Sequence, residues 1–195
     1  MAGGPVVFHG PLCVAEATTA RSAALACWSC SGENNIRNNS LSGGGGLLDI
    51  GVYTFGSTRF MTNEEPQTIS HASIIWENKV DVWAHVSAQF QTFNFIGVTS
   101  MRMHPRQEMN FHGSKGLIKL TSPFNPQVFG EAKVHIDTKD GMRKTMKFTT
   151  ENHYVNQLEA FSSAIKRGSE FICNLEFSKG TLNMIDMVFE NEKIS

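Results

Sequence analysis

The chain contains 195 residues, 41% of them apolar, and its 17 basic and 18 acidic residues nearly cancel. That length and apolar fraction predict a single domain with a well-filled core. The sequence shows no basic stripe with interleaved aromatic residues, which argues against a nucleic-acid partner, and no apolar run approaches the roughly 18 to 20 residues of a membrane-spanning helix.

Residues 1–33 differ in character from the rest of the chain. They are rich in small residues, hold three of the four cysteines and show weak periodicity, so the one element they indicate is a short helix over 15–26. They also lack the charged start of a secretory signal. We therefore expect 1–33 to be a disordered or non-native leader, arising from a truncated gene or a shifted reading frame, and 34–195 to form the domain.

This leader contains a C-x-x-C pair, Cys27 and Cys30. Such pairs occur in redox sites and as half of a zinc site. A structural zinc needs a second pair of ligands at set spacing, which Cys13 and His9 do not supply. Free thiols in a reducing cytosol are the favoured interpretation, so we expect no metal and a cytoplasmic location.

A run of four glycines, 43–46, leads into Leu-Leu-Asp-Ile-Gly-Val-Tyr53, which predicts a helix ending near residue 61. Asp49 and Tyr53 are four residues apart and so project from one helical face, flanked by Gly45 and Gly56. This pattern predicts a polar, substrate-facing pair in a glycine-lined recess; the alternative is a flexible connection with two surface residues. An apolar stripe on the opposite face is expected to anchor the helix: Leu48, Val52 and Phe55.

The chain after this helix alternates with a period of two. Between residues 80 and 90, valines and alanines face one side and polar residues the other, which is typical of a half-buried strand. Short turns near Asn78, 113–116 and 139–141 favour antiparallel neighbours. Similar alternation predicts further strands over 69–76, 93–103, 107–111, 116–121, 128–137 and 142–148.

Helical spacing returns in two later segments, Tyr154–Ile165 and Leu182–Phe189. Helices before and after the strands predict an α+β fold, an open, largely antiparallel β-sheet with helices on one face. The other face then stays uncovered, with Trp83, His85 and Ile96 among its residues. A face of this mixed character is typical of a homodimer interface; the alternative is an ordinary solvated face.

The glycine segment resembles a known signature. Gly44-Gly-Gly-Leu-Leu-Asp-Ile-Gly-Val-Tyr53 is similar to the GGG-x-x-D-x-G-x-[HY] motif of the Gfo/Idh/MocA family, which includes glucose–fructose oxidoreductase and inositol dehydrogenase. The resemblance covers about residues 34–195 and implies the family's C-terminal domain. Further segments agree in the same order: 102–116, 117–126, 152–161 and 175–178.

The family's nucleotide-binding half has no counterpart in this sequence. Family members carry a G-x-G-x-x-G turn and a Glu-Lys-Pro motif in a Rossmann domain, and neither motif occurs here. The resemblance therefore implies NAD(P) for the intact enzyme and no cofactor bound by this chain alone. It also implies a sugar or polyol substrate, a homodimer through the uncovered sheet face, and a partner in a separate Rossmann domain.

The resemblance also implies roles for individual residues. Tyr53 would be the proton-transfer residue, although many members carry His there, and Asp49 would orient substrate hydroxyls. Arg37 would help to position the substrate, with Gly45 and Gly46 beside it. His153 and Tyr154 match positions that approach substrate; the alternative for them is a capping or core role.

Three hypotheses follow for the chain as a whole. The first is the substrate-binding and oligomerisation domain of an NAD(P)-dependent sugar or polyol oxidoreductase, inactive by itself. The second is a non-catalytic homodimerising module. The third is a truncated gene product, whose exposed surface where the Asp49 helix would have packed makes it marginally soluble.

Overall fold

Eight strands form one open sheet in the computed structural model, which describes residues 20–27, 32, 35–149 and 151–194. The strand order is β2-β3-β4-β1-β5-β6-β7-β8. Among the described strands, β1 and β4 are parallel and the other neighbours are antiparallel. The strands are β1 (Ala20–Cys27), β2 (Thr68–Glu77), β3 (Val80–Gln89), β4 (Phe93–Ser100), β5 (Arg106–Gly113), β6 (Gly116–Thr121), β7 (Lys133–Thr138) and β8 (Arg143–Lys147).

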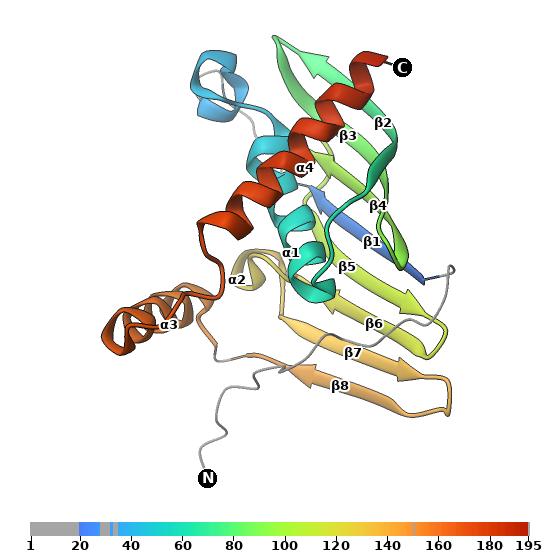
Figure 1. The fold of residues 1–195 in the computed structure, drawn as a ribbon, viewed down its shortest axis with the longest axis vertical. Coiled ribbons are helices and arrows are strands. Elements are labelled where there is room, and N and C mark those ends of the chain that lie inside the picture. Colours follow the sequence, from blue (N-terminus) through green and yellow to red (C-terminus); the bar gives the residue numbers. More distant parts are fainter. Residues whose placement is uncertain (1–19, 28–31, 33–34, 150, 195) are drawn as a thin grey trace.

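The helices lie on one side of this sheet. Figure 1 shows α4 and α1 over the part formed by β2 to β5, while α3 extends away from the sheet and no described helix covers β7 or β8. Among the described helices, none has the length and apolar character needed to cross a bilayer. The helices are α1 (Val52–Thr62), α2 (Pro126–Phe129), α3 (His153–Arg167) and α4 (Leu175–Ile194), with 3₁₀ turns at Ile36–Asn38 and Ser40–Ser42 and a π-helical turn at Leu47–Gly51.

The core lies between the sheet and the helices α1 and α4. Alternate residues of β3 are buried, as the period of two predicts. Phe55 of α1 contacts Phe95 of β4 edge to face, with ring centroids 5.6 Å apart, and α4 contributes Met184 and Ile185, both 0% exposed. The predicted α+β architecture, with an open, largely antiparallel sheet and helices on one face, is confirmed.

The first strand was not predicted. Residues 15–26 were expected to form a short helix within a leader, but Ala20–Cys27 is β1, paired with β4 on one side and β5 on the other. Ala24 and Ala26 are 6% and 0% exposed, because their small side chains lie under the helices. The predicted boundary at residue 33 is therefore not a boundary of the sheet, and residues 1–19 lie outside the described part of the chain.

Two other details differ from the predicted elements. The strand expected over 128–137 begins only at Lys133, because Pro126 starts the short helix α2. The buried face of the Asp49 helix is also shifted: Leu48 is 39% exposed, whereas Leu47 and Ile50 are 0% exposed. The π-helical turn holds more residues per turn than an α-helix, so it brings Leu47 rather than Leu48 into line with Phe55.

Candidate functional site

An ion pair between Arg37 and Asp49 forms the centre of the candidate site. Arg37 Nε lies 2.6 Å from Asp49 Oδ2, and the two side chains are 41% and 31% exposed. Arg37 sits in the 3₁₀ turn Ile36–Asn38, whose capping residue Asn35 accepts a hydrogen bond from the Arg37 amide through its side chain at 3.1 Å. Asp49 sits in the π-helical turn, a rare conformation that often marks functional sites.

Tyr53 lies one turn beyond Asp49, at the start of α1. Its ring is 5.4 Å from that of Phe124, centroid to centroid, and its side chain is 40% exposed. Burial is the largest effect that raises the pKa of the Tyr53 phenol, and the neighbouring Tyr154 and Asp49 raise it further, while Arg37 lowers it. The phenol is therefore held in its protonated form at neutral pH.

The start of α3 contributes Tyr154 and His153. Asn152 caps this helix by accepting hydrogen bonds from the amides of Tyr154 and Val155 at 3.1 and 3.3 Å. The two aromatic rings of His153 and Tyr154 are 4.0 Å apart, and the Tyr154 hydroxyl donates to Asn125 Oδ1 at 3.4 Å. Both ring nitrogens of His153 are buried without a hydrogen-bond partner among the protein atoms.

The loop before α2 completes the site, and the sequence prediction missed it. Gln107 of β5 holds this loop, since its Oε1 accepts hydrogen bonds from the amides of Phe124 and Asn125 at 3.2 and 3.0 Å. Phe124 then contacts Tyr53, and Asn125 contacts Tyr154. The Pro-Phe-Asn-Pro sequence of this loop was the available signal, but within the segment 117–126 it supported only the family resemblance and indicated no contact to the site.

The recess was predicted from Gly45 and Gly56, and neither they nor the neighbouring Gly46 faces open space. Gly45 and Gly46 are buried, and a Cβ atom at Gly46 would lie 3.2 Å from Asp81 Oδ2. Gly56 faces α4, where an added Cβ would lie 3.5 Å from Thr181 Oγ1. The prediction of a glycine-lined recess is wrong, because these positions provide space for packing against Asp81 and α4.

The structure thus brings Arg37, Asp49, Tyr53 and Tyr154 into one electrostatic environment, with His153 against Tyr154. The C-x-x-C prediction is not tested, since Cys30 lies outside the described residues. Cys27 is buried at the end of β1; burial raises the pKa of its thiol and Arg106 opposes this.

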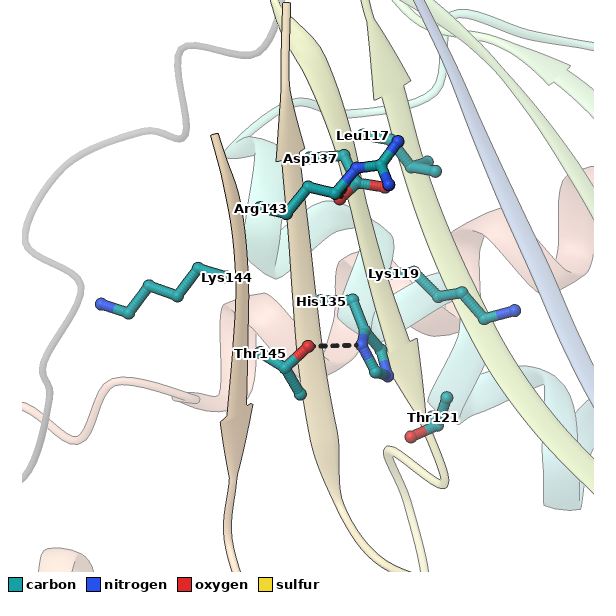
Figure 2. Close-up of a pocket in the computed structure, with 8 residues that line it drawn as sticks. All are labelled: Leu117, Lys119, Thr121, His135, Asp137, Arg143, Lys144 and Thr145. Carbon is teal, nitrogen blue, oxygen red and sulfur yellow. Dashed lines mark hydrogen bonds and ion pairs between the residues drawn. The ribbon is translucent and has the colours of Figure 1, made fainter. Parts of the chain in front are cut away.

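A shallow cleft on the β6–β8 part of the sheet lies apart from this site. Figure 2 shows His135 Nδ1 beside Thr145 Oγ1, at 3.0 Å, and Arg143 beside Asp137, at 3.9 Å. None of the eight residues that line this cleft belongs to the predicted site. Arg143 and Asp137 face each other on neighbouring strands, and Lys119 pairs with Glu108 of β5 at 3.0 Å, as cross-strand pairs of a solvated sheet face do.

Comparison with known proteins assigns the chain. A model of the "GFO/IDH/MocA C-terminal domain" matches residues 12–119, which is 108 of the 195 residues. The chain belongs to the GFO/IDH/MocA family. The match begins before β1, so the family domain includes residues that the sequence prediction had placed in the leader.

A relative and several solved structures agree with this assignment. The chain is 26% identical over 164 residues to the uncharacterized oxidoreductase ORF334 of Rhizobium meliloti, covering 79% of this chain and 48% of the relative. It therefore spans about half the length of that protein. The assignment supports an oxidoreductase C-terminal domain of the GFO/IDH/MocA type.

Three structures share the fold. Aldose-aldose oxidoreductase from Caulobacter crescentus, complexed with glycerol, matches with a TM-score of 0.77 and 18% identity over 89% of this chain and 53% of that one. KijD10, a 3-ketoreductase from Actinomadura kijaniata in complex with NADP and TDP-benzene, matches with a TM-score of 0.72 and 21% identity over 90% and 55% of the two chains. UDP-N-acetylglucosamine 3-dehydrogenase from Acidithiobacillus ferrooxidans matches with a TM-score of 0.74 and 13% identity over 91% and 55%.

Proposed function

We propose that this chain is the substrate-binding and oligomerisation domain of an NAD(P)-dependent oxidoreductase that acts on a hydroxyl group of a sugar or polyol. The observation that carries the proposal is the Arg37–Asp49 ion pair beside Tyr53, at the meeting point of α1, α3 and the loop before α2. Charged and phenolic groups that are partly exposed here match the hydrogen-bonding needs of a polyhydroxylated ligand.

Each of these side chains has a chemical task in the proposal. A secondary alcohol loses its hydroxyl proton as hydride leaves, so an acid or base has to lie within hydrogen-bond reach. Because its pKa is raised, Tyr53 donates its proton when a carbonyl is reduced, and it accepts one only when a further cation lowers that pKa. Asp49 accepts hydrogen bonds from substrate hydroxyls while Arg37 holds its carboxylate in place.

The glycine turn of this chain does not fit the phosphates of NAD(P). Helix starts bind phosphates through their free amide groups. Here Asp81 Oδ2 already accepts the amide of Leu47 at 2.6 Å, and Gly46 donates to the same carboxylate. That negative charge also repels a phosphate. The nicotinamide cofactor, which accepts or supplies the hydride, is therefore assigned to another domain, and the isolated chain is expected to show no turnover.

The apolar residues of α3 support a partner domain beside the site. Tyr154, Leu158, Phe161 and Ile165 recur at helical spacing and are 58%, 67%, 49% and 66% exposed. We call them the α3 stripe. An unpartnered stripe of this size is typical of an interface, and a nucleotide-binding domain packed there would bring its cofactor to Tyr53.

The uncovered sheet face supports homodimerisation, which is also the alternative function as a non-catalytic module. Ile75 and Ile96 are 53% and 38% exposed on it, and the rings of Trp83 and His85 are 6.4 Å apart. Sedimentation of the wild-type chain should show a dimer, and Trp83→Arg should produce a monomer because it places a charge in the interface. A wild-type monomer at all concentrations would rule out this part of the proposal. A cytoplasmic location stays a prediction.

Ligand binding tests the proposed substrate class directly. The ¹⁵N-labelled chain is titrated with glycerol, glucose and inositol, and the amide and arginine Nε–H signals are followed. Binding should shift the signals of Arg37 and Tyr53 and should weaken in Asp49→Asn, whereas His135→Gln, in the β6–β8 cleft, serves as the matched control. Incubation with NAD or NADP and the same ligands should give no turnover. Shifts that cluster at His135, or turnover by the isolated chain, would contradict the proposal.

A further inference from the structure

Asp81 is a buried carboxylate that the proposed chemistry does not use. The period of two in β3 predicts it on the uncovered face, yet it is 2% exposed. Its Oδ2 atom accepts a hydrogen bond from the Leu47 amide at 2.6 Å, and its carboxylate also accepts the Gly46 amide. Asp81 therefore binds a turn that lies 34 residues earlier in the chain.

This contact replaces a missing helix cap. The first amide groups of a helical segment have no partner within the helix and are normally bonded by the side chain of a capping residue. Gly46 occupies the capping position and supplies no side-chain hydrogen bond. The carboxylate of Asp81 takes this role from another strand, and its negative charge lies where the helix dipole favours an anion.

The glycine run is the space that this carboxylate needs. A Cβ atom at Gly45 would overlap Asp81 Oδ1, and one at Gly46 would lie 3.2 Å from Oδ2. Gly45 also has a φ of +125°, which residues with side chains rarely adopt. Gly44 is restricted from the other side, because its Cβ would lie 2.5 Å from the Arg37 carbonyl oxygen.

The glycine run connects the two halves of the ion pair. The Gly45 amide donates to the Arg37 carbonyl at 3.0 Å, which joins the Arg37 turn to the glycine run. Asp49 follows Leu47 by two residues and its amide donates to the Gly45 carbonyl at 3.2 Å. A shift of the turn therefore moves Arg37 and Asp49 relative to each other.

We propose that Asp81 is a positioning residue, which fixes the glycine turn and thereby holds the Arg37–Asp49 pair and Tyr53 in their geometry for ligand binding. The relevance of that geometry to a sugar or polyol rests on the proposed function. Burial of this carboxylate is unfavourable, since it raises the pKa of Asp81 to about 6 against the lowering effect of the Leu47 and Gly46 amides. A fold that keeps a costly carboxylate here is consistent with a role in setting geometry.

The test compares Asp81→Asn with Val86→Ala, a substitution of a buried residue on the same strand. Two signals are measured: the Arg37 Nε–H resonance, which reports the ion pair, and the affinity for the polyol that binds best to the wild type. The asparagine oxygen can accept a hydrogen bond from only one of the two amides, Leu47 or Gly46, while its NH₂ group faces the other. The Arg37 resonance should therefore move, and the affinity for the polyol should fall about 10-fold or more. Val86→Ala should change stability and leave both signals unchanged.

A double-mutant cycle with Gly46→Ala tests the same inference with a milder change. Gly46 has helical dihedrals, so alanine is allowed there apart from its approach to Oδ2. Gly46→Ala should weaken ligand binding in the wild-type background. It should have a smaller effect when Asp81 is already asparagine, because the contact between the turn and this side chain is then already changed. Equal effects in both backgrounds would overturn the inference.

The outcomes separate this inference from the proposed function. If the wild type binds no polyol but the Arg37 resonance moves in Asp81→Asn, positioning by Asp81 is supported and the proposed function fails. If polyols bind and neither the resonance nor the affinity changes in Asp81→Asn, Asp81 has only a structural role and the inference is wrong.

Discussion

The two halves of the sheet differ in how well they are covered. The α1/α4 half comprises β2, β3, β4, β1 and β5 with their two helices, and its largest fully buried side chains include Phe55, Phe90 and Phe95. The β6–β8 half is followed in the chain by α3, which extends away from the sheet (Figure 1) and in which Ala164 is the one buried residue among those described. One half therefore has a core of its own, and the other leaves apolar surface open.

This difference explains where the candidate site lies. Arg37, Asp49 and Tyr53 belong to the well-packed half, whereas His153 and Tyr154 come from α3. The site thus combines a rigid part with a part that has few buried contacts. We infer that the rigid part sets the geometry of the ion pair, whereas α3 is the part that the proposed partner domain would cover.

The first prediction compares a phenylalanine-to-alanine substitution in each half, and the largest loss of stability is expected in the α1/α4 half. Phe55→Ala removes a ring that is 1% exposed and should lower the free energy of unfolding by about 3 to 5 kcal/mol. Phe161→Ala removes a ring that is 49% exposed and contacts Phe171, so it should cost about 1 kcal/mol or less. Chemical denaturation measures both values. Similar losses for the two variants would contradict the comparison between the halves.

The second prediction concerns pH and the buried Asp81. Its pKa is about 6 in the folded chain against 3.8 in the unfolded chain, so the folded state binds more protons between those values. Stability therefore falls as pH rises from about 4 to about 6, by about 3 kcal/mol for this group. Asp81→Asn should remove this slope when unfolding is measured across that range.

Glu108 provides a control of opposite sign for this pH experiment. Burial opposes its ionisation, but hydrogen bonds from Asn110, Arg106 and Lys119 outweigh burial and lower its pKa to about 2. Its contribution to stability is present above its unfolded pKa of 4.5 and is lost as pH falls toward 2. Glu108→Gln should therefore change the limb below about pH 5 and leave the slope between about pH 5 and pH 6 intact. A slope that persists in Asp81→Asn would show that another group causes it.

The same contrast explains what the sequence could predict. Half-buried strands such as β3 alternate visibly, because one face meets the core and the other meets solvent. The sequence of β1 shows no such alternation, since its buried residues are Ser22, Ala24, Ala26 and Cys27 and its partners β4 and β5 lie far along the chain. Small residues in a row favour a helix by local propensity, so the strand was missed.

Only those residues of the site that belong to a local pattern or to a family motif could be predicted from the sequence. Asp49 and Tyr53 were named from the glycine motif and Arg37 and Tyr154 from the wider family resemblance, and the structure places the four in one electrostatic environment. The sequence does not show why the run before Leu47 consists of glycines, because Asp81 lies next to them only in the folded chain. Gln107 was hidden in the same way, since it fixes the loop of Phe124 from another strand.

The third prediction concerns Arg59 of α1 in the well-packed half, which pairs with Glu65 in the loop after α1 and also donates to α4. The Arg59 side chain is 3% exposed and bonds Glu65 through Nε at 2.7 Å and Nη2 at 2.5 Å, while Nη1 donates to the Phe177 carbonyl at 2.7 Å. Glu65 is 65% exposed, so when its charge is removed water accepts part of the hydrogen bonding of Arg59. Glu65→Gln should lower the free energy of unfolding by about 1 kcal/mol.

Glu77→Gln is the matched control for this substitution. Glu77 pairs with Arg102 at 2.8 Å, but both side chains are well exposed, at 46% and 37%. Loss of that pair should change stability by about 0.5 kcal/mol or less. The comparison fails if the two variants lose the same stability, because burial of Arg59 would then have no consequence.

The smallest effect is expected at the α3 stripe. Leu158 and Ile165 are 67% and 66% exposed, and glutamine has a helix propensity at least as favourable as either. The double variant Leu158→Gln, Ile165→Gln should therefore change the free energy of unfolding by about 0.5 kcal/mol or less in the isolated chain. It should also bind less of a dye specific for apolar surface. A loss above about 1 kcal/mol would mean that α3 packs on the domain in solution, so that its stripe is part of this chain's own core rather than a surface for a partner.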